Sequence, residues 1–590
     1  MAESSDTATA SRWLSAFERA LSAFDAKSAA ALFAGECYWR DLLSVTWTIK
    51  TVEGRGEIET MLASQLTAIR PANFAIEGEA QTVDGKIEAW FTFETATARG
   101  RGHLRLQEGK AFTLLTTMLE LKGHEERQGF TRDQGIEHGA RKHRKTWLDR
   151  RDEETAALGH TQQPYCVIIG GGQGGLALGA RLKRLGVPTL ILEKNARAGD
   201  SWRNRYDSLV LHDPVWYDHL PYIPFPSHWP VFTPKGQMGD WLECYARLMQ
   251  LNFWGSTECI SATFDGDRKT WTVTARRDGN DIVLQPKHLV FATGSYGPPN
   301  EIMIKGQADF QGVRYHSSRH QTAAAHRGKK VIVIGANSSG HDMCADFWEC
   351  GADVTMIQRS PTTVVRSETL IELAFAGLYS DQAVSNGITT DKADLIFAST
   401  PFRLMAQAQR TFYQGIVERD RDLIQRLNKA GFRTDYGDDG SGLMMKALRT
   451  GSGYYIDVGC SELIARGDVK VRSGVDVAEI RPRSVVLSDG TELKADVIVH
   501  ATGYRPMNEW VAQIVSREAA DLIGPNWGYG SGFKGDPAPW QGELRNMWKP
   551  LAHEALWLHG GNLHLSRHYS LYVALQLKAR MEGIATPVFA

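Results

Sequence analysis

Two stretches of this chain repeat one local order: a short apolar run, a glycine-rich turn, a helical pattern and a second apolar run. They read YCVIIGGGQGGLALGARLKRLGVPTLILEK at 165–194 and KKVIVIGANSSGHDMCADFWECGADVTMIQRS at 329–360. A strand that leads through a glycine turn into a helix brings the helix N-terminus to a position where it can face a phosphate. The repeat therefore predicts an α/β fold with two Rossmann-like domains, each binding a dinucleotide.

The first unit carries the full set of residues for such a site. Gly170, Gly172 and Gly175 match G-x-G-x-x-G, and Glu193 closes the second strand. The first glycine permits a sharp turn, the second lets the backbone approach a pyrophosphate, and the third lets helix and strand pack closely. A carboxylate at Glu193 accepts hydrogen bonds from an adenosine ribose. These residues, with Lys194 beside them, predict a site for an adenosine that has a free 2′-hydroxyl.

The second unit differs in its middle glycine and in its acidic residue. Asn337 replaces the glycine, and Gln358 and Arg359 stand where Glu193 and Lys194 stand in the first unit. Without the carboxylate a 2′-phosphate is not repelled, and a guanidinium can bind it bidentately. This favours NADPH, with some use of NADH because Gln358 is neutral; alternatively, Arg359 is only an exposed side chain of a solvated turn. The predicted cofactor contacts here are Gly335, Asn337, Ser338, Gly340, Arg359 and Ser360.

Two further short strands end in the same three residues. HLVFATGSYGPP (288–299) and DVIVHATGYRP (496–506) both leave their strands through Ala-Thr-Gly. Small residues at this point let the chain leave a sheet close to a bound nucleotide, so Thr293, Thr502 and Gly503 join the predicted cofactor contacts. Two dinucleotide sites in one chain imply electron transfer between two cofactors.

Composition excludes several other classes of protein. The chain has 67 basic and 68 acidic residues, so its net charge of −1 gives no electrostatic reason to expect nucleic acid or an anionic membrane as a partner. No apolar run approaches the roughly 20 residues that span a bilayer, and the N-terminus does not read as a secretory signal. The seven cysteines are scattered, which suggests reduced thiols and a cytoplasmic protein. No metal site is expected, and the partner is a small molecule.

The first 125 residues have a different character. Trp13, Phe17, Leu21 and Phe24 recur at helical spacing, and strand-like segments follow from Phe74, with a hairpin signal at Asp84-Gly85. This order predicts a small α+β domain. A charged stretch follows, which we interpret as a linker or a solvated surface helix. The predicted divisions are 1–125 (α+β domain), 126–163 (linker), 164–325 (first dinucleotide domain), 326–455 (second dinucleotide domain) and 456–590 (return to the first).

From Tyr165 onward the chain resembles a known family. The motifs are the two glycine turns, GDSWRNRYDSLVLHDP (199–214), GYYIDVG (453–459) and ATGY (501–504). Together they resemble the class B flavin-dependent monooxygenases, a family of flavin-containing monooxygenases, Baeyer–Villiger enzymes and the plant enzymes that convert indole pyruvate to auxin. The resemblance implies FAD in the first domain and NADPH in the second.

Residues 310–320 are similar to the family fingerprint F-x-G-x-x-x-H-x-x-x-(F/Y/W). Phe310, Gly312 and His316 fit it, whereas His320 replaces the final aromatic residue. In the family this segment joins the two cofactor domains and bears on their coupling, which makes His316 a candidate catalytic residue. The alternative is that His316 is only a hydrogen-bonded linker residue. The missing aromatic blurs the distinction between the heteroatom-oxidising and Baeyer–Villiger subgroups.

The resemblance also indicates residues near the flavin. The stretch GDSWRNRY, with Trp202 and Tyr206, is similar to the family element G-x-W-x-x-x-x-Y, although its tryptophan lies one position later, so Trp202 is expected at FAD. Many relatives place an asparagine in the loop that follows, but LHDP is closer to the plant branch, and it makes His212 and Asp213 the expected catalytic pair. Alternatively, His212 only packs against FAD. The C-terminal helix of the family points at the flavin, and its start is expected at residues 566–570, with Ser566 near the cofactor.

The N-terminal region resembles the cone-shaped SnoaL-like fold that extends the type II branch of this family. Trp39, Arg40 and Asp41 are expected either to line a cavity or to be a core tryptophan beside a surface ion pair. A structural or dimerising role is favoured over a catalytic one.

The function implied by the resemblance is an NADPH- and dioxygen-dependent oxygenation that proceeds through a flavin C(4a)-peroxide. Oxygen insertion into ketones is expected, with N- or S-oxygenation of soft nucleophiles as the alternative. Two other classes stay open. A thiol-disulfide flavoreductase needs a cysteine pair near the flavin, and the closest pair is Cys344 and Cys350. The last class is a non-catalytic NADPH sensor.

Overall fold

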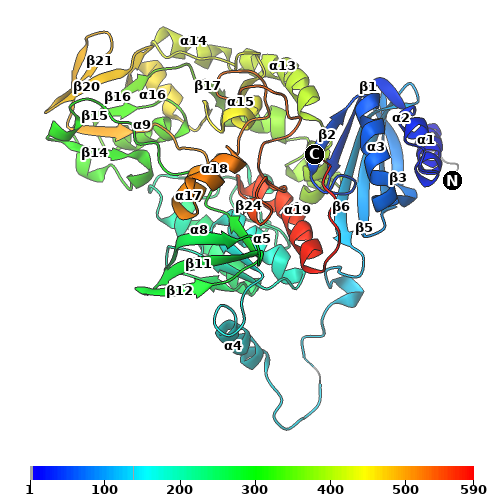
Figure 1. Ribbon diagram of the computed structural model, residues 1–590. Coiled ribbons are helices and arrows are strands. Elements are labelled where there is room, and N and C mark those ends of the chain that lie inside the picture. Colours follow the sequence, from blue (N-terminus) through cyan, green and yellow to red (C-terminus); the bar gives the residue numbers. More distant parts are fainter. Residues whose placement is uncertain (1–3, 137, 590) are drawn as a thin grey trace.

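The computed structural model describes residues 4–136 and 138–589. It contains an N-terminal domain and two α/β domains, with an extended linker between the first and second parts (Figure 1). None of the helices within the described residues is long and apolar enough to cross a membrane.

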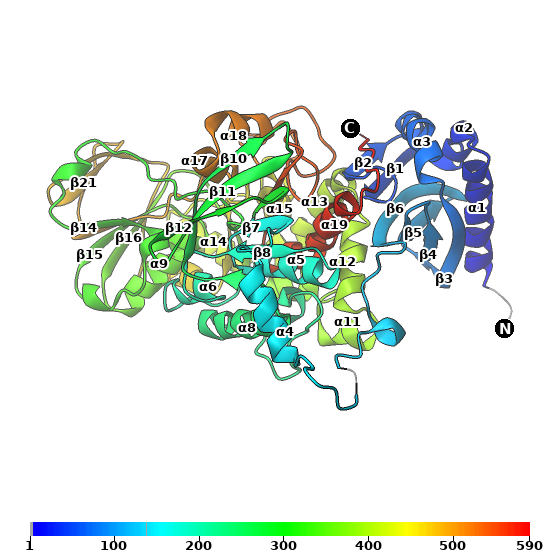
Figure 2. The same cartoon turned by 60° about the horizontal axis from the view of Figure 1, so that its bottom comes forward.

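The N-terminal domain is a six-stranded sheet with helices packed on one face (Figures 1 and 2). The strand order is β2-β1-β6-β5-β4-β3, and all neighbours are antiparallel except β1 and β6, which are parallel. The elements are α1 (Ser5–Ser22), α2 (Ala26–Ala30), β1 (Phe33–Leu42), β2 (Ile49–Glu53), α3 (Arg55–Ile69), β3 (Ala72–Val83), β4 (Lys86–Glu94), β5 (Ala98–Gln107) and β6 (Lys110–Leu121).

Two expectations for this domain are confirmed and one is wrong. The predicted helix is α1, which buries Trp13, Phe17 and Leu21, although Phe24 lies beyond its end and is exposed. Asp84 and Gly85 form the turn between β3 and β4 with positive φ values of 47° and 72°. The expected surface ion pair is wrong, because Arg40 and Asp41 are 1% and 0% exposed. Arg40 reaches a carboxylate in the C-terminal part of the chain, and Asp41 accepts hydrogen bonds from Thr46 and Thr116.

The linker is largely exposed, although it contacts the first α/β domain through Arg151 to Asn252 and Glu154 to Lys183. It contains the 3₁₀ turn η1 (Gly129–Thr131) and the helix α4 (Trp147–Ala157), which has no buried residue among those described. A capping box between Thr146 and Asp149 starts this helix.

The first glycine unit forms the centre of a five-stranded parallel sheet with the order β24-β13-β7-β8-β9. Its short strands are continuous apolar runs such as CVII and HLVF, typical of parallel strands that are buried on both faces. The elements are β7 (Cys166–Ile169), α5 (Gln173–Arg184), β8 (Thr189–Leu192), α6 (Asp200–Arg203), α7 (Val215–Asp218), α8 (Lys235–Leu248), β9 (Phe253–Trp254), β10 (Thr257–Asp265), β11 (Thr270–Arg277), β12 (Asn280–Leu284), β13 (His288–Phe291), α17 (Asn508–Ile514), α18 (Arg517–Ile523), β24 (Leu556–Leu558) and α19 (Leu563–Met581).

The second glycine unit forms the centre of another five-stranded parallel sheet, with the order β14-β23-β15-β16-β19. The elements are η2 (Gln307–Asp309), β14 (Val313–His316), η3 (Ser317–Arg319), η4 (Ala324–His326), β15 (Lys330–Ile334), α9 (Ser338–Glu349), β16 (Asp353–Gln358), α16 (Cys460–Arg466), β19 (Lys470–Ser473), β20 (Val477–Arg481), β21 (Ser484–Leu487), β22 (Glu492–Lys494) and β23 (Val497–His500).

The strand pairing departs from the predicted boundaries at residues 325 and 455. β14 precedes the first boundary and β19 and β23 follow the second, yet all three belong to the second sheet. β23 pairs with both β15 and β14, which satisfies backbone groups that would otherwise be buried without partners. The chain returns to the first sheet only at β24.

A helical segment is inserted between β17 and β18, two parallel strands that lie outside the main sheets. Some of its buried side chains form a separate hydrophobic cluster, and others join the cores of the two α/β domains. The elements are β17 (Thr363–Arg366), α10 (Ser367–Leu370), η5 (Ile371–Phe375), α11 (Asp381–Ser385), α12 (Thr390–Ala398), α13 (Phe402–Arg419), α14 (Arg421–Lys429), α15 (Gly442–Thr450) and β18 (Tyr454–Asp457).

Candidate functional site

Each glycine turn is pressed against one of the Ala-Thr-Gly exits. A Cβ built on Gly170 would lie 2.3 Å from the carbonyl oxygen of Ala292, and one on Gly335 would lie 2.2 Å from that of Ala501. Both glycines also have positive φ values, 105° and 123°. The two motifs that the sequence presented separately therefore form one structural unit in each domain, at the carboxyl ends of neighbouring parallel strands.

The helices that follow the turns begin without a side-chain cap. Gly172, the N-cap of α5, has no side chain, and Asn337, the N-cap of α9, makes no side-chain cap hydrogen bond among the described residues. In the described structure, a Cβ on Gly172 would contact only Ser201 Oγ, at 3.5 Å. Free first-turn amides and an unobstructed backbone are what a pyrophosphate requires. The first turn therefore fits a dinucleotide.

Three other predicted residues surround the first turn. Glu193 is buried, and its carboxylate accepts hydrogen bonds from Gly171 N at 2.7 Å and Asn195 N at 2.9 Å, so it is held at the end of β8. Thr293 Oγ1 is buried without a hydrogen-bond partner in the described part of the chain, which fits a ligand contact. Trp202 donates to Gln173 at 3.2 Å. Lys194 is exposed beside Glu193.

The second turn presents a basic edge. The Gln358 amide is buried; it donates to Arg433 O at 2.9 Å and accepts from Arg433 N at 2.8 Å. Gln358 therefore anchors the segment that contains Arg433, and its neutral side chain adds no negative charge at the turn. The Arg359 side chain is 76% exposed and 3.7 Å from Asp476, and Ser360 is exposed beside it. Arg433 is an exposed cation that sequence reasoning missed, because no local pattern brings residue 433 to residue 358.

The two domains are joined by hydrogen bonds between the Ala-Thr-Gly exits. Thr502 Oγ1 donates to Asn300 O at 2.7 Å, and Asn300 N donates to Gly503 O at 2.9 Å. Ser338 of the second turn donates to Tyr454 O at 3.1 Å, which fixes the GYYIDVG motif. The sequence motifs shared with the family thus converge at the crossing between the domains.

His316 lies in this crossing. It is 1% exposed, with Nε2 3.0 Å from Gly503 O and Nδ1 3.1 Å from the Ser318 backbone nitrogen. Burial lowers its pKa, so the neutral ring donates to Gly503 and accepts from Ser318. Both ring nitrogens are engaged by the backbone, which is the arrangement expected of a hydrogen-bonded linker residue.

His320 explains the departure from the fingerprint. Its ring stacks on Tyr315 with 5.9 Å between centroids, and its nitrogens lie 2.8 Å from Tyr315 Oη and 2.7 Å from Asp346 Oδ2. The histidine therefore provides the aromatic packing that the fingerprint requires and adds an anchor to α9.

His212 lies where the first domain contacts the second. Its Nε2 is 3.9 Å from Asp342 Oδ1 in α9, and its ring meets Tyr455 edge-on. Tyr206 donates to the other Asp342 oxygen. Burial raises the pKa of Asp342, and His212 opposes the rise. The carboxylate that faces His212 thus comes from Asp342, two residues after Gly340, which sequence reasoning missed.

Asp213 follows His212 in the loop, and its charge interacts with that of His212. Burial raises its pKa to about 6, with the charge of His212 opposing the rise. Its charge interacts with Tyr217, Asp218 and Tyr454. Asp213 is therefore an acid whose pKa burial holds above its ordinary value.

The C-terminal helix begins earlier than expected. α19 starts at Leu563, and the Asn562 side chain accepts from Leu565 N at 2.9 Å. Asparagine after two glycines is a stronger start signal than serine in the second turn, so the expected start at 566–570 is wrong. Ser566 is buried within the helix. Gln173 of α5 donates to Gly561 O at 3.2 Å, which brings the start of α19 to the first glycine turn.

The cysteines do not form the pair that a thiol-disulfide reductase needs. All seven lie in the described part of the chain, and all are free. Cys344 is buried in α9, the helix that follows the second turn, and Cys350 is the C-cap of that helix, at the end away from the turn.

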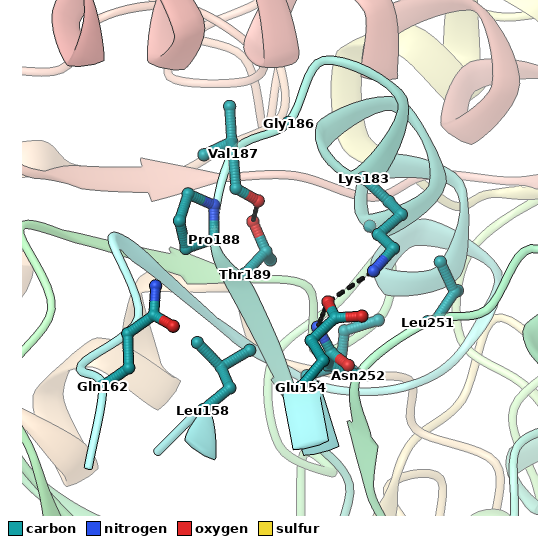
Figure 3. Close-up of a pocket in the computed structure, with 12 residues that line it drawn as sticks. Glu154, Leu158, Gln162, Lys183, Gly186, Val187, Pro188, Thr189, Leu251 and Asn252 are labelled. Atoms are coloured by element: carbon teal, nitrogen blue, oxygen red, sulfur yellow. Dashed lines mark hydrogen bonds and ion pairs between the residues drawn. The ribbon is translucent and has the colours of Figure 1, made fainter. Parts of the chain in front are cut away.

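A cavity of about 190 Å³ lies away from this site (Figure 3). Its wall includes Val187, Pro188 and Thr189 at the amino end of β8, and Glu154 of α4, which pairs with Lys183. The glycine turns lie at the carboxyl ends of the strands, where ligands bind in open α/β sheets. This cavity therefore belongs to the contact of the linker helix with the first domain.

Comparisons with known proteins agree with this geometry. The sequence model of the family described as pyridine nucleotide-disulphide oxidoreductase matches residues 167–374. The chain is 30% identical over 367 residues to indole-3-pyruvate monooxygenase YUCCA1 of Oryza sativa subsp. japonica, covering 62% of this chain and 81% of that protein. It is 29% identical over 344 residues to the probable indole-3-pyruvate monooxygenase YUCCA10 of Arabidopsis thaliana, covering 58% and 81%.

Among solved structures, cyclohexanone monooxygenase with bound ε-caprolactone in its loose conformation has the same fold. The TM-score is 0.51 at 18% identity, and the match covers 71% of this chain and 88% of that one. The chain belongs to the class B flavin-dependent monooxygenase family, whose cofactors are FAD and NADP(H).

Proposed function

We propose that this protein uses NADPH and dioxygen to insert an oxygen atom beside the carbonyl group of a ketone, the Baeyer–Villiger reaction. When bound, FAD and NADPH supply hydride transfer and the activation of dioxygen. The observation that carries the proposal is the position of His212. It lies at the contact of the two domains and faces the Asp342 carboxylate at 3.9 Å.

The direction of proton transfer distinguishes the two candidate reactions. Attack on a carbonyl carbon needs an unprotonated oxygen nucleophile, whereas transfer of oxygen to sulfur or nitrogen needs a protonated, electrophilic one. A neutral imidazole accepts a proton, and a neighbouring carboxylate stabilises the resulting cation. Tyr206 donates to Asp342 Oδ2 and leaves Oδ1 facing His212. His212 can therefore hold a proton at Nε2, which favours the carbonyl reaction.

Names of relatives agree with a carbonyl substrate. The similar plant proteins are indole-3-pyruvate monooxygenases, and pyruvates carry a ketone. N- or S-oxygenation of soft nucleophiles is the alternative that the experiment below separates from it.

The proposed cofactor contacts follow the two turns, with NADPH favoured over NADH. We assign to FAD the residues Gly170, Gly172, Gly175, Glu193, Lys194, Trp202, Thr293 and Ser566, and to NADPH the residues Gly335, Asn337, Ser338, Gly340, Arg359, Ser360, Thr502 and Gly503. The six-stranded N-terminal sheet with its helices supports the SnoaL-like assignment and the type II branch.

His212→Ala tests the proposal. The variant should bind FAD and accept hydride from NADPH at a near-parental rate, but ketone product per NADPH should fall by roughly a hundredfold, the lower range for loss of a general base. Hydrogen peroxide should account for the missing oxygen. His228→Ala, an exposed histidine on the following segment, is the matched control and should behave as the parent.

Three results would contradict parts of this proposal. A His212→Ala variant that couples NADPH to product as well as the parent makes His212 a packing residue. A parent that oxidises sulfides and no ketone supports the heteroatom reaction. A parent that binds NADPH and forms no product with any substrate supports a sensor.

A further inference from the structure

The N-terminal domain meets the rest of the chain through a buried arginine. Arg40 in β1 donates from Nε and Nη2 to the two oxygens of Glu543, at 2.7 and 2.8 Å. Nη1 donates to Ala398 O at 2.7 Å, and Nη2 also donates to Tyr569 Oη at 3.1 Å. Arg40 is 1% exposed and Glu543 2%. One side chain thus contacts three separate segments of the catalytic part of the chain.

Stability alone is a weak explanation for this ion pair. Two buried charges lose hydration, and apolar residues of similar volume often stabilise a protein equally well or better. A bidentate pair with additional hydrogen bonds, here from Thr51 to Glu543 at 2.6 Å, does fix one docking geometry. The other contacts of Arg40 identify the elements whose positions this docking geometry fixes.

Two of the Arg40 contacts lie on helices that are themselves paired. Ala398 is the last residue of α12, and Tyr569 lies in α19. One turn before Ala398, Asp394 accepts two hydrogen bonds from Arg567 of α19, both at 2.9 Å, and both side chains are buried. Arg40 therefore spans the same two helices as the Asp394–Arg567 pair.

Arg567 in turn holds the loop that carries His212. Its Nη1 donates to Tyr217 O at 2.7 Å and to His219 O at 2.6 Å. The Tyr217 hydroxyl is also 3.1 Å from His564 Nδ1 in the first turn of α19. Movement of α19 or α12 would therefore move residues 212–219.

A second contact supports the side of α19. Thr117 of β6 and Tyr572 share a buried hydrogen bond of 2.9 Å, one turn beyond Tyr569. Both views show α19 between the N-terminal sheet and the first α/β domain (Figures 1 and 2). The N-terminal domain holds the flank of this helix, while its start lies at the first glycine turn.

We propose that Arg40 is a positioning residue through which the N-terminal domain sets the place of α19, α12 and the His212 loop. This rests on the proposed function for its effect on turnover. Loss of Arg40 should separate NADPH oxidation from product formation, because residues 217–219 of the His212 loop are held by Arg567 of α19.

The experiment compares Arg40→Met with the double variant Arg40→Met/Glu543→Met. The single variant leaves Glu543 buried without its cation and should melt at a lower temperature. The double variant removes both charges and should recover most of that loss. If Arg40 positions the loop, the double variant should still show roughly tenfold faster amide hydrogen exchange in residues 211–220. Its product per NADPH should fall by roughly tenfold to a hundredfold, the effect of about 1 Å of misplacement.

The matched control is Arg403→Met, which breaks a more exposed ion pair of the same interface, Arg403 to Glu53 at 2.7 Å. It should change neither the exchange of residues 211–220 nor the coupling. A double variant with parental exchange and parental coupling would overturn the proposal and make Arg40 a structural lock. Hydrogen exchange tests whether Arg40 positions residues 211–220 even if the parent oxygenates no ketone. Failure of this inference and failure of the proposed function therefore give different results.

Discussion

Gly172 and Gly175 lie three residues apart in the first turn, but they differ in what surrounds them. A Cβ on Gly175 would lie 1.9 Å from Gly170 O, whereas one on Gly172 would meet only Ser201 Oγ at 3.5 Å in the described structure. Gly172→Ala should therefore fold and lose FAD, because the methyl group blocks the approach of the pyrophosphate. Gly175→Ala should be destabilised even without FAD.

Flavin absorbance of the purified proteins, together with thermal melting of the flavin-free forms, checks this pair. A Gly172→Ala variant that retains a full complement of FAD would remove the pyrophosphate from this turn.

Arg359 is the residue on which coenzyme preference depends. Its side chain is 76% exposed and its ion pair with Asp476 is long, at 3.7 Å, so it is free to bind a 2′-phosphate. Arg359→Ala should raise the KM for NADPH by about tenfold, the effect of losing roughly 1.5 kcal/mol from a charge-assisted hydrogen bond. The KM for NADH should change little, since NADH has no 2′-phosphate.

Steady-state kinetics with both coenzymes, and calorimetric titration with 2′-phospho-AMP, measure this difference. Arg472→Ala, an exposed arginine of the same sheet, is the control. Equal losses with NADPH and NADH would show that Arg359 does not contact the phosphate.

At the scale of single residues, the sequence indicated those whose roles depend on neighbours in the chain. The turn glycines and Glu193 are defined by spacing within one strand–helix–strand unit, so the sequence displays them. Asp342 and Arg433 act on His212 and Gln358 across 130 and 75 positions, respectively. Such pairings form only when the sheets assemble, and no local sequence pattern indicates them.

Among the elements, α19 shows how a helix start can be misjudged. Asn562 accepts from Leu565 N, while Ser566 lies within the helix. Asn562→Ala should lower the free energy of unfolding by about 1 kcal/mol, as is typical for loss of an N-cap. Ser566→Ala should have the smaller effect, because its hydroxyl makes only a 3.5 Å contact with Gly561 O.

Denaturant titration of the two variants makes the comparison, and hydrogen exchange of the first turn of α19 locates the effect. A larger loss for Ser566→Ala would restore the later helix start.

The strand β14 shows that the sequence alone does not indicate which sheet a short strand joins. Residues 310–320 have neither a clear strand alternation nor a helical stripe, and the partner of β14 is β23, with Val313 opposite Val497. The composition of each strand was readable, but the pairing that places both in the second sheet was not. The domain boundaries at 325 and 455 departed from the topology for this reason.

For the whole molecule, the three-part organisation followed from the sequence, whereas the docking of the parts did not. The sequence left open whether Arg40 lines a cavity or belongs to a surface ion pair, because nothing near Arg40 indicates that its partner is Glu543, more than 500 positions away. The contact between the N-terminal domain and α19 could therefore be found only from the folded structure.

The central claim is that this protein transfers one atom of dioxygen to an organic carbonyl compound at the expense of NADPH. Its most direct test is turnover of a ketone under ¹⁸O₂, with mass spectrometry of the product and simultaneous measurement of NADPH and hydrogen peroxide. We expect an ester or lactone that carries one ¹⁸O atom for each NADPH oxidised, with little peroxide. A product without ¹⁸O, or oxidation of NADPH that yields only peroxide with every ketone, would contradict the claim.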